Sequence, residues 1–523
     1  MGDTTANPGQ GHTFRRFESG KTMWNWEDLS EKIFQQDKSY KCPTYVLRTP
    51  PCQGGCPSGH DIRGWLAIAR GMDKPPVEGM PWQEYAFQRM MDANPFPSVM
   101  GRVCPAPCED GCNRNEVDDF VGINGVEQYV GDWAIENKTS APAAGQDTGK
   151  RIAVIGGGPA GLSAVYFLRR IGHAVTLFEA NDKLGGMMRF GIPGYRTPRD
   201  KLDVEIDRIL ALGVEVRTNT KVGRDVSIAD LEAQYDAIYW AIGAQQGRGL
   251  PVAGWGAENC VSGIEFLDMF NRGWMFSTAK RIVVVGGGDT SIDVASVARR
   301  LGHIDSTAQH DASGSEVFGY TARDVAGTLR RGGVSATLTS LFPVEQMTAA
   351  EREREDAKRE GIDIKGGVMP LEVILDASTG KATGLKMCQC TMNGMTPSPI
   401  PGTEFEIACD MIVSAIGQMA DFANGLEELD NGRGSIAIDG VYKVRGKEKH
   451  FAGGDAVRPH LLTTAIGHGR IAAETISHFL DGAPNDKRPK VDTHHFNLLE
   501  ELQQRGLEVE KYDGEQKRGT SEA

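Results

Sequence analysis

The stretch RIAVIGGGPAGLSAVYFLRRIGHAVTLFE, Arg151 to Glu179, constrains the fold more than any other part of the chain. An apolar strand runs into a glycine-rich turn, a segment of helical period follows, and a second β-rich run ends at Glu179. A glycine turn alone would be weak evidence. Here it stands in the complete strand–turn–helix–strand setting of the G-x-G-x-x-G fingerprint, with an acid about 20 residues on. The sequence therefore predicts an α/β unit that binds a dinucleotide.

Each residue of this fingerprint has a physical role. Gly156 permits the tight turn, Gly158 lets the backbone approach a pyrophosphate, and Gly161 lets the helix pack closely on the strand. The first turn of the helix offers unpaired N–H groups to the phosphates. Glu179 is expected to accept hydrogen bonds from a ribose hydroxyl.

A second copy of the pattern appears in KRIVVVGGGDTSIDVASVARRLG. A strand at 282–285 leads into Gly286 and Gly288, and a helix starts near Thr290. The third glycine position holds Ser291, which is small enough for close packing. Two such units in one chain predict two nucleotide sites.

The segment HFAGGDAVRPHLLTTAIGHGRIAAETISHFL contains a strand, a turn around Gly454 and Asp455, and a helix that is expected to begin near Thr463 and Thr464. An acid at a strand end, followed by a helix N-terminus, can hold a ribityl or phosphate group. After a dinucleotide fingerprint, this segment is interpreted as the second half of a flavin site.

Six of the ten cysteines lie in two groups, KCPTYVLRTPPCQGGCP and GRVCPAPCEDGC. Helices are expected between the groups, over Ile62–Arg70 and Trp82–Asp92. Pro105 and Pro107 exclude a regular helix around the second group, so its cysteines are expected on a looped backbone. Zinc sites usually pair ligands as C-x2-C, which neither group does. Iron–sulfur ligation is favoured over a zinc site and over purely structural cysteines.

Charge and composition narrow the class of protein. The formal net charge of −13 argues against nucleic-acid binding and against attraction to anionic membranes. There is no apolar run of about 20 residues, the length of a membrane span. The polar start MGDTTANPGQ has no signal-peptide core. A cytoplasmic location without disulfides is expected.

A reactive cysteine pair beside either fingerprint would indicate disulfide reduction. Neither a C-x4-C nor a C-x2-C pattern follows Gly156 or Gly286. The pair Cys388 and Cys390 is expected in a polar, turn-rich region with a structural role.

Over residues 40–480 the chain resembles the glutamate synthase small (β) subunit family, through GRVCPAPCEDGC, VIGGGPAGL, LGGMMRFGIP and FAGGDAV. That group also includes the flavin half of dihydropyrimidine dehydrogenase and the large subunit of NADH-dependent ferredoxin:NADP oxidoreductase. The resemblance implies FAD, a nicotinamide nucleotide and [4Fe–4S] clusters. No glutaminase domain is present in the chain.

The resemblance also implies particular residues. FAD is expected at Gly156, Gly158, Pro159, Ala160, Gly161, Glu179, Gly186, Arg189, Gly454, Asp455, Thr464 and Ala465. The nicotinamide nucleotide is expected at Gly286, Gly288, Asp289, Thr290 and Ser291. One cluster is expected on Cys56, Cys104, Cys108 and Glu127. A second would use Cys42, Cys52 and Cys112, but the sequence lacks the family's fourth cysteine there, so its presence stays open.

The predicted fold is α/β, with two Rossmann-like domains for FAD and NAD(P) preceded by a helical iron–sulfur domain. We expect the iron–sulfur domain at 1–140 and a split FAD domain at 147–265 and 415–480. The NAD(P) domain is expected as an insertion at 266–414, and a charged tail at 484–523. No side-chain nucleophile is required, because the flavin carries the hydride chemistry.

The predicted function is that of an electron-transfer flavoprotein subunit. It passes electrons between NAD(P)H, FAD, a cluster and a redox partner within a hetero-oligomer. Candidate partners are a glutamate synthase large subunit, a 2-oxoacid oxidoreductase, a sulfite-reductase-type enzyme or a ferredoxin. Two alternatives stay open: a stand-alone flavin reductase for a small molecule or quinone, and a non-enzymatic assembly subunit that binds nucleotides.

NADH is favoured over NADPH. The strand after the second fingerprint helix is delayed by an insertion at 304–333 and ends in Ser340, Leu341 and Phe342, where NADPH-using family members carry arginines. Without a guanidinium, a 2′-phosphate would have little charge-assisted bonding. Arg330 and Arg331, just upstream, are the alternative source of that charge.

Overall fold

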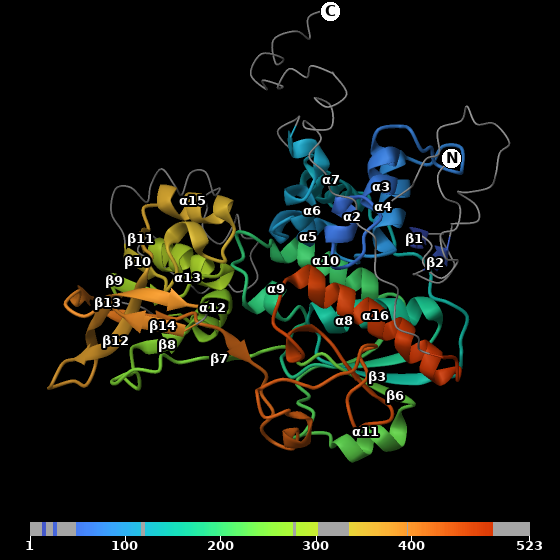
Figure 1. The fold of residues 1–523 in the computed structure, drawn as a ribbon. Coiled ribbons are helices and arrows are strands. Elements are labelled where there is room, and N and C mark those ends of the chain that lie inside the picture. Colours follow the sequence, from blue (N-terminus) through green and yellow to red (C-terminus); the bar gives the residue numbers. More distant parts are fainter. Residues whose placement is uncertain are drawn as a thin grey trace, which may run out of the picture.

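Three bodies of secondary structure follow one another in the computed structural model (Figure 1). A helical region comes first, a parallel sheet with its helices follows, and a second parallel sheet is inserted into the first unit. The structure describes residues 13–16, 25–28, 49–116, 121–275, 279–301, 334–394 and 396–484. Cys42, Arg330, Arg331 and residues 485–523 of the predicted tail lie outside these ranges.

The helical region contains α2 (Pro51–Gly55), α3 (Ile62–Ala69), α4 (Trp82–Met91), α5 (Pro97–Val103), α6 (Pro107–Asp110) and α7 (Ile123–Glu136). The helices expected over 62–70 and 82–92 are confirmed as α3 and α4. α5 ends at Val103, ahead of Pro105, so Cys104 lies on a looped backbone as expected. For Cys108 the expectation is wrong: Pro107 begins α6, because proline is tolerated in the first turn of a helix, and Cys108 lies inside this short helix. Ala106, which precedes α6, adopts the left-handed conformation with φ 57°. A short strand pair, β1 (Thr13–Arg16) and β2 (Asn25–Asp28), precedes the helices.

The first sheet has the strand order β18-β6-β3-β4-β5, and all its pairings are parallel. Its strands are β3 (Arg151–Ile155), β4 (Ala174–Phe178), β5 (Glu215–Arg217), β6 (Ala237–Trp240) and β18 (His450–Ala452). Its helices are α8 (Pro159–Ile171), α9 (Met187–Phe190), α10 (Arg199–Leu210), α11 (Ile228–Gln234) and α16 (Leu462–Leu480). The strand order reverses beside β3, which is where doubly wound sheets bind ligands.

The second sheet has the order β11-β10-β9-β16-β8, again wholly parallel. It is formed by β8 (Cys260–Ser262), β9 (Arg281–Val285), β10 (Ser335–Thr339), β11 (Asp363–Lys365) and β16 (Met411–Ser414), with α12 (Gly263–Asn271), α13 (Asp289–Arg300) and α15 (Glu351–Arg359). β8 lies within the range 147–265 that was expected to belong to the FAD domain, but it pairs with β16 of the second sheet. The two units are linked by the antiparallel pair β7 (Gln246–Gly247) and β17 (Gln418–Met419).

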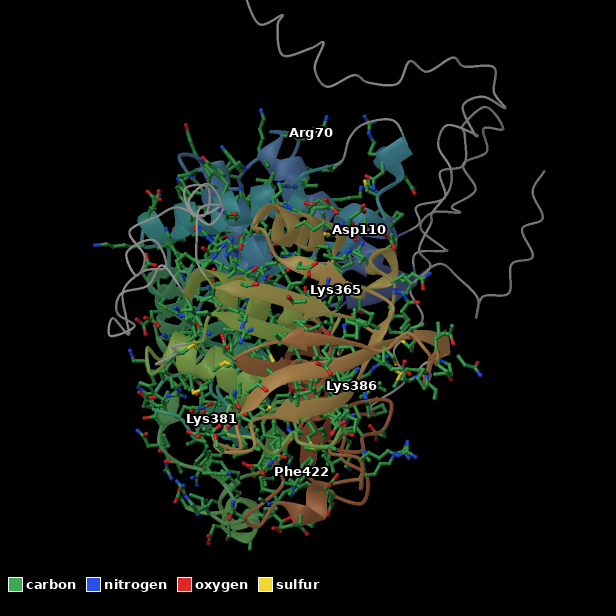
Figure 2. The ribbon with its side chains drawn as sticks, turned by 90° about the vertical axis from the view of Figure 1, so that its left-hand side faces the viewer. Arg70, Asp110, Lys365, Lys381, Lys386 and Phe422 are labelled. Carbon is green, nitrogen blue, oxygen red and sulfur yellow. The ribbon has the colours of Figure 1, made fainter. Side chains whose placement is uncertain are left out.

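An antiparallel sheet extends the second unit. It contains β12 (Val368–Leu375), β13 (Ala382–Asn393), β14 (Thr396–Pro399) and β15 (Phe405–Ala408). Figure 2 faces this side of the molecule, with Lys365 at the end of β11 and Lys386 on β13. The expectation of a turn-rich region around Cys388 and Cys390 is wrong. Both residues lie inside β13, the longest strand among the described residues, and both are buried in inward-facing positions of the sheet. The composition around them does not indicate this sheet.

Side chains of helix α10, which belongs to the first sheet's unit, form hydrogen bonds with the helical region. Its buried Glu205 accepts hydrogen bonds from the backbone N–H groups of Ser98 (2.7 Å) and Val99 (3.2 Å) at the start of α5. Arg208 donates to the carbonyls of Ala134 and Thr139 at the end of α7. One helix therefore satisfies orphan backbone groups at a helix N-terminus and a helix C-terminus.

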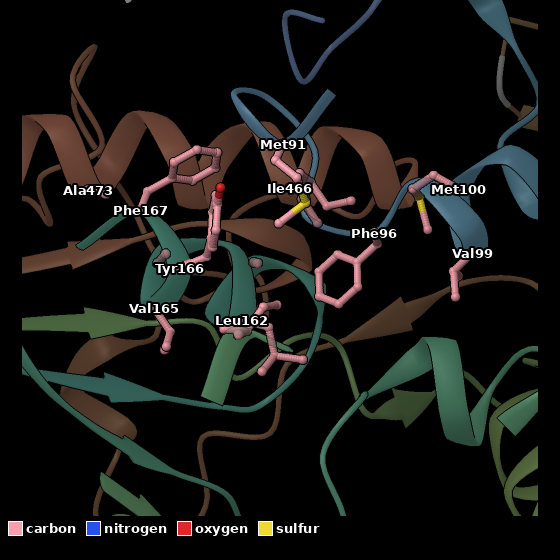
Figure 3. Packing of buried hydrophobic residues seen from close by; sticks show 14 of the residues in the cluster. Met91, Phe96, Val99, Met100, Leu162, Val165, Tyr166, Phe167, Ile466 and Ala473 are labelled. Carbon is pink, nitrogen blue, oxygen red and sulfur yellow. The ribbon is translucent and has the colours of Figure 1, made fainter. Parts of the chain in front are cut away.

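One hydrophobic core continues from the helical region into the first sheet. Figure 3 shows Met91 and Phe96 beside Leu162 and Tyr166 of α8 and Ile466 of α16. Burial of this shared apolar surface holds the two bodies together. Within the described parts of the chain, no helix is both long and apolar enough to cross a membrane.

Candidate functional site

A cavity of about 380 Å³ opens at the carboxyl ends of the first sheet's strands. It is lined by nine of the residues expected at FAD, namely Gly156, Gly158, Pro159, Ala160, Glu179, Gly186, Gly454, Asp455 and Ala465. Two segments more than 250 residues apart in sequence are brought together here, because β18 pairs with β6 and β6 with β3. This cavity is the candidate flavin site.

The fingerprint turn has the backbone geometry expected from its glycines. Gly156 has φ 108°, and a Cβ there would lie 2.3 Å from the carbonyl oxygen of Ala241. A Cβ on Gly161 would lie 1.8 Å from the carbonyl oxygen of Gly156, so α8 can approach β3 only with glycine at this position. Gly158 precedes the helix in an extended conformation, with Pro159 in the first turn.

Glu179 directly follows β4 and lies beside this turn. One carboxylate oxygen, Oε2, accepts from the backbone N–H of Gly157 at 2.7 Å. The other, Oε1, accepts from the backbone and side-chain nitrogens of Asn181, both at 2.8 Å. The side chain is 7 % exposed and lines the cavity. It is thus held in a fixed orientation toward the space where a ribose would lie.

Asp455 and Gly454 approach from the opposite side. Gly454 has φ 67° and donates its N–H to Nδ1 of His468 at 3.1 Å. Asp455 accepts from the backbone N–H of His460 at 3.3 Å. Burial raises the pKa of Asp455 to about 6. A polar ligand group at this acid would relieve that desolvation.

Three residues expected at FAD do not line the cavity. Gly161 acts through helix packing, as described above. The guanidinium of Arg189 donates to the carbonyl of Leu184 at 2.5 Å and pairs with Asp203. The hydroxyl of Thr464 forms a hydrogen bond with His460 on the exposed side of its helix.

The sequence did not indicate that the second unit also lines this cavity. Ile264, Glu265, Asp268 and Arg272 of the α12 region contribute to its wall. Arg272 donates to Oδ1 of Asn181 at 2.7 Å and lies 4.2 Å from the ring centre of Phe190. These contacts join the two units across the cavity mouth. No local pattern signals them, because they arise only from how the units pack.

The second fingerprint repeats the close approach of its first glycine to a neighbouring carbonyl, although Gly286, unlike Gly156, has no positive φ. A Cβ on Gly286 would lie 2.4 Å from the carbonyl oxygen of Ala415, as one on Gly156 would from Ala241. Ser291 is fully buried and its hydroxyl donates to the carbonyl of Gly288 at 2.6 Å. Asp289 accepts from the backbone N–H of Ala350 at 3.3 Å, and Thr290 follows it in the first turn of α13.

Ser340 lies at the end of β10, beside this second turn. It is 2 % exposed, and a Cβ on Gly287 would lie 2.8 Å from its hydroxyl oxygen. The hydroxyl accepts from the backbone N–H of Phe342 at 3.2 Å. The position at which a second Rossmann strand presents an acid or an arginine to the nucleotide ribose is thus occupied by a small neutral side chain.

A second, smaller cavity lies in the helical region. Cys56, Cys104, Cys108 and Glu127 all line it, together with His60, Asn94 and Thr463. The structure therefore brings together the four residues expected as ligands of one cluster. Among the described residues, no three His, Cys, Asp or Glu side chains meet the geometry for a single metal ion.

Burial is the main cause of the shifted pKa values of the acid and thiol in this cavity. Glu127 is 6 % exposed, accepts from Nδ2 of Asn94 at 2.8 Å, and lies 3.4 Å from Nδ1 of His60. Burial raises the pKa of Glu127 to about 8 and that of the Cys104 thiol to about 12. Buried acids and thiols without a compensating charge are costly. A cationic centre in the cavity would supply that charge.

The other cysteine group is only partly described. Cys52 lies on α2, and Cys112 follows α6, while Cys42 is outside the described residues. Burial, with a smaller contribution from the neighbouring Cys112, raises the pKa of Cys52 to about 11. Helix α2, which carries Cys52, packs against α6, which Cys112 follows.

Residues 150–469 match the family described as pyridine nucleotide-disulphide oxidoreductase. Residues 27–139 match the domain described as dihydropyrimidine dehydrogenase domain II, 4Fe-4S cluster. The chain belongs to the pyridine nucleotide-disulphide oxidoreductase family and carries a 4Fe-4S domain in front of it. The predicted fold class, oxidoreductase class and set of cofactors, FAD, a nicotinamide nucleotide and a [4Fe–4S] cluster, are confirmed.

Curated relatives confirm the resemblance to the glutamate synthase small subunit. The chain is 30% identical to the glutamate synthase [NADPH] small chain of Escherichia coli, over 86% of this chain and 91% of that one. It is 33% identical to the NADP(+)-dependent formate dehydrogenase subunit beta of Moorella thermoacetica, over 83% of this chain and 60% of the relative. It is 30% identical to the NADPH-Fe(3+) oxidoreductase subunit beta of Geobacter sulfurreducens, of which it spans 64%. The chain thus covers less than two thirds of these last two relatives.

Among solved structures, the fold is similar to that of Mycobacterium tuberculosis FprA in complex with NADPH. The TM-score is 0.51 at 16% identity, over 64% of this chain and 85% of that one. This similarity supports the α/β architecture of the two nucleotide units.

Proposed function

We propose that this chain is an electron-transfer subunit that passes electrons between NAD(P)H, FAD, a [4Fe–4S] cluster and a protein partner. The observation that carries the proposal is that the two cavities share one helical turn. Leu462 and Ala465 line the candidate flavin cavity, while Thr463, between them in sequence, lines the cysteine cavity. Electron transfer requires such proximity, whereas a purely structural cysteine domain does not.

A bound FAD would supply the conversion between two-electron hydride transfer with NAD(P)H and one-electron transfer with the cluster. The protein's role is to bind and orient. The N–H groups at the start of α8 would bind the pyrophosphate, Glu179 would accept hydrogen bonds from the adenosine ribose, and Asp455 with the start of α16 would hold the ribityl-phosphate side. Arg272 lines the cavity from the inserted unit and holds that unit against Phe190 and Asn181 of the flavin unit.

The cluster is proposed on Cys56, Cys104, Cys108 and Glu127. The buried thiols and the buried acid fit this group, because a cluster would remove the penalty of their desolvation. His60 and Asn94 would orient the Glu127 carboxylate through their contacts with Oε1. A second cluster would use Cys42, Cys52 and Cys112, but the sequence lacks the fourth cysteine that the family provides for it.

The nicotinamide nucleotide is proposed at Gly286, Gly288, Asp289, Thr290 and Ser291, with NADH preferred because Ser340 offers no charge to a 2′-phosphate. The partner is proposed to be a redox subunit or a ferredoxin in a cytoplasmic hetero-oligomer. The names of the relatives support a multi-subunit assembly, since several of them are subunits or small chains.

Anaerobic titration with NADH and NADPH tests the proposal. Bleaching of the flavin absorbance should be followed by the EPR signal of a reduced [4Fe–4S] cluster. Alkylation of accessible thiols after cluster assembly should leave flavin reduction intact, because no cysteine pair follows either fingerprint.

Cys108→Ser should keep flavin reduction by the nucleotide but lose both the EPR signal and the reduction of a ferredoxin. Cys260→Ser, at a cysteine that lines neither cavity, is the matched control. An iron-free protein that reduces dyes but no protein acceptor would instead identify a stand-alone flavin reductase. Flavin that no nucleotide bleaches would identify a non-enzymatic assembly subunit.

A further inference from the structure

Thr463 occupies an unusual position at the start of α16. Its side chain is 6 % exposed and lines the cysteine cavity. Its hydroxyl makes no hydrogen bond of normal geometry to any described residue. A buried hydroxyl without a partner is costly, so this one indicates a partner that the protein atoms do not supply.

Helix capping does not explain this threonine. Threonine near a helix start commonly accepts from backbone N–H groups. In α16 the N-cap is Leu461, which makes no side-chain cap bond, and Thr463 stands two residues further on. Its side chain instead lines the cavity that Cys56, Cys104 and Cys108 also line.

The position of Thr463 is fixed by tight packing on both sides of its helix. A Cβ on Gly467 would lie 2.4 Å from the carbonyl oxygen of Pro57, next to Cys56. A Cβ on Gly469 would lie 2.2 Å from the carbonyl oxygen of Ala160, in the first turn of α8. The buried Arg470 donates to the carbonyl of Ser58 at 2.9 Å. The helix is therefore packed tightly between the cysteine loop and the dinucleotide fingerprint. This packing fixes the face of α16 that carries Thr463 toward the cysteine cavity.

We propose that the Thr463 hydroxyl donates a hydrogen bond to a sulfur of the cluster held by Cys56, Cys104 and Cys108, and thereby raises its reduction potential. This inference rests on the proposed function. A hydrogen bond to a cluster sulfur stabilises the reduced, more negative state more than the oxidised one. By raising the reduction potential, Thr463 would make the cluster a better acceptor of electrons from the neighbouring flavin.

Three variants of the full-length protein test this proposal: Thr463→Val, which keeps the shape and removes the hydroxyl, Thr463→Ser, which keeps the hydroxyl, and Thr475→Val. Thr475 is a buried threonine of the same helix that lines neither cavity, so its variant controls for a generic loss of packing. The potential of the cluster is measured by redox titration with EPR detection, after iron and flavin contents are shown to match the wild type.

Thr463→Val should lower the equilibrium constant for one-electron reduction of the cluster about tenfold, as for loss of one hydrogen bond. This corresponds to a potential about 59 mV more negative. Thr463→Ser and Thr475→Val should retain the wild-type potential. An unchanged potential in Thr463→Val, with cluster and flavin intact, overturns the proposal.

A second measurement does not depend on the valine variant assembling its cluster. ENDOR spectra of the reduced wild-type cluster, in H2O and D2O, should contain an exchangeable coupled proton that persists in Thr463→Ser. Absence of any such proton in the wild type also overturns the proposal. Failure of the proposed function is distinguishable, because it would be seen as missing iron or missing reduction by NAD(P)H in the wild-type protein.

Discussion

Arg196, on the loop after α9, forms an ion pair with Asp293 on α13, the helix of the second fingerprint. The same guanidinium also pairs with Glu353 on α15. Arg196 belongs to the flavin unit and both acids to the inserted unit, so this contact sets the orientation of the two units relative to each other. The acid partner is buried, with 9 % of the Asp293 side chain exposed.

Removal of this ion pair should weaken the packing of the flavin unit against the inserted unit. Arg196→Met leaves Asp293 without its partner, and removal of one member of a buried pair costs about 3 kcal/mol. We expect a lower unfolding midpoint and slower flavin reduction by NAD(P)H in stopped-flow experiments, at unchanged flavin content. Arg281→Met removes the half-exposed pair with Asp410 and should cost less than about 1 kcal/mol. Equal midpoints for the two variants would contradict the coupling role.

The second prediction concerns flavin affinity. Glu179→Ala removes the carboxylate expected to hold the adenosine ribose, and also the acceptor for the N–H of Gly157. Loss of charge-assisted hydrogen bonds should weaken FAD binding about 10- to 100-fold. The dissociation constant is measured by flavin fluorescence on deflavinated protein. Glu406→Ala, at an exposed acid on β15, should bind FAD like the wild type. If Glu179→Ala also does so, Glu179 is not a ribose ligand.

The third prediction concerns iron. Anaerobically purified protein should contain about four irons per chain, the content of one [4Fe–4S] cluster. Cys104→Ser should reduce this content strongly, because serine is a poor substitute for a thiolate ligand. Cys260→Ser should not. About eight irons would show that Cys42, Cys52 and Cys112 recruit a fourth ligand, and stoichiometric zinc in place of iron would refute the assignment.

The fourth prediction concerns the choice of nucleotide. With one artificial acceptor, kcat/KM should be higher for NADH than for NADPH, or similar for both, because Ser340 provides no guanidinium. Phe342→Arg places a cation just beyond β10 and should raise the NADPH-to-NADH ratio of kcat/KM about tenfold or more. Phe342→Leu controls for loss of the ring. A strong NADPH preference in the wild type would point to Arg330 or Arg331 instead.

The fifth prediction is a pH dependence of the flavin-free protein. Burial raises the pKa of Asp455 to about 6, above its value near 3.8 in an unfolded chain. The folded state therefore binds the proton more tightly, and the stability contributed by this group is lost as the pH rises from about 4 to 6. The loss amounts to about 3 kcal/mol. Asp455→Asn should raise the melting temperature relative to wild type at pH 7, and this gain should shrink toward pH 4. A gain that is independent of pH would show that Asp455 does not titrate in this range.

The sequence was most informative where structure is local. The turn and packing geometry around Gly156 and Gly161 was predictable because a fingerprint fixes backbone conformation over a few residues. The convergence of Cys56, Cys104 and Cys108 came from family resemblance, and the structure brings these residues to one cavity. Their roles as ligands stay predictions.

Features that depend on packing between distant segments were not predictable. Arg272 reaches the flavin cavity from the inserted unit, and no pattern near it signals this. The start of α16 was expected near Thr463 and Thr464, and the family resemblance assigned Thr464 to the flavin site, while nothing in the sequence indicated Thr463 as a residue of the cysteine cavity. A rotation of about 100° per residue puts one hydroxyl in the cysteine cavity and the other toward His460.

The split of the first sheet has a consequence for biosynthesis. β6 ends at Trp240, but its neighbour β18 begins only at His450, after the whole inserted unit. At ribosomal rates of about 5–20 residues per second, the open edge of β6 waits for tens of seconds before its partner strand emerges. Gly454, Asp455 and α16 appear later still, so FAD can be captured only near the end of translation. Every nascent chain thus passes through a period in which β6 is an unpaired edge, and chaperone binding during that period would protect this strand from aggregation.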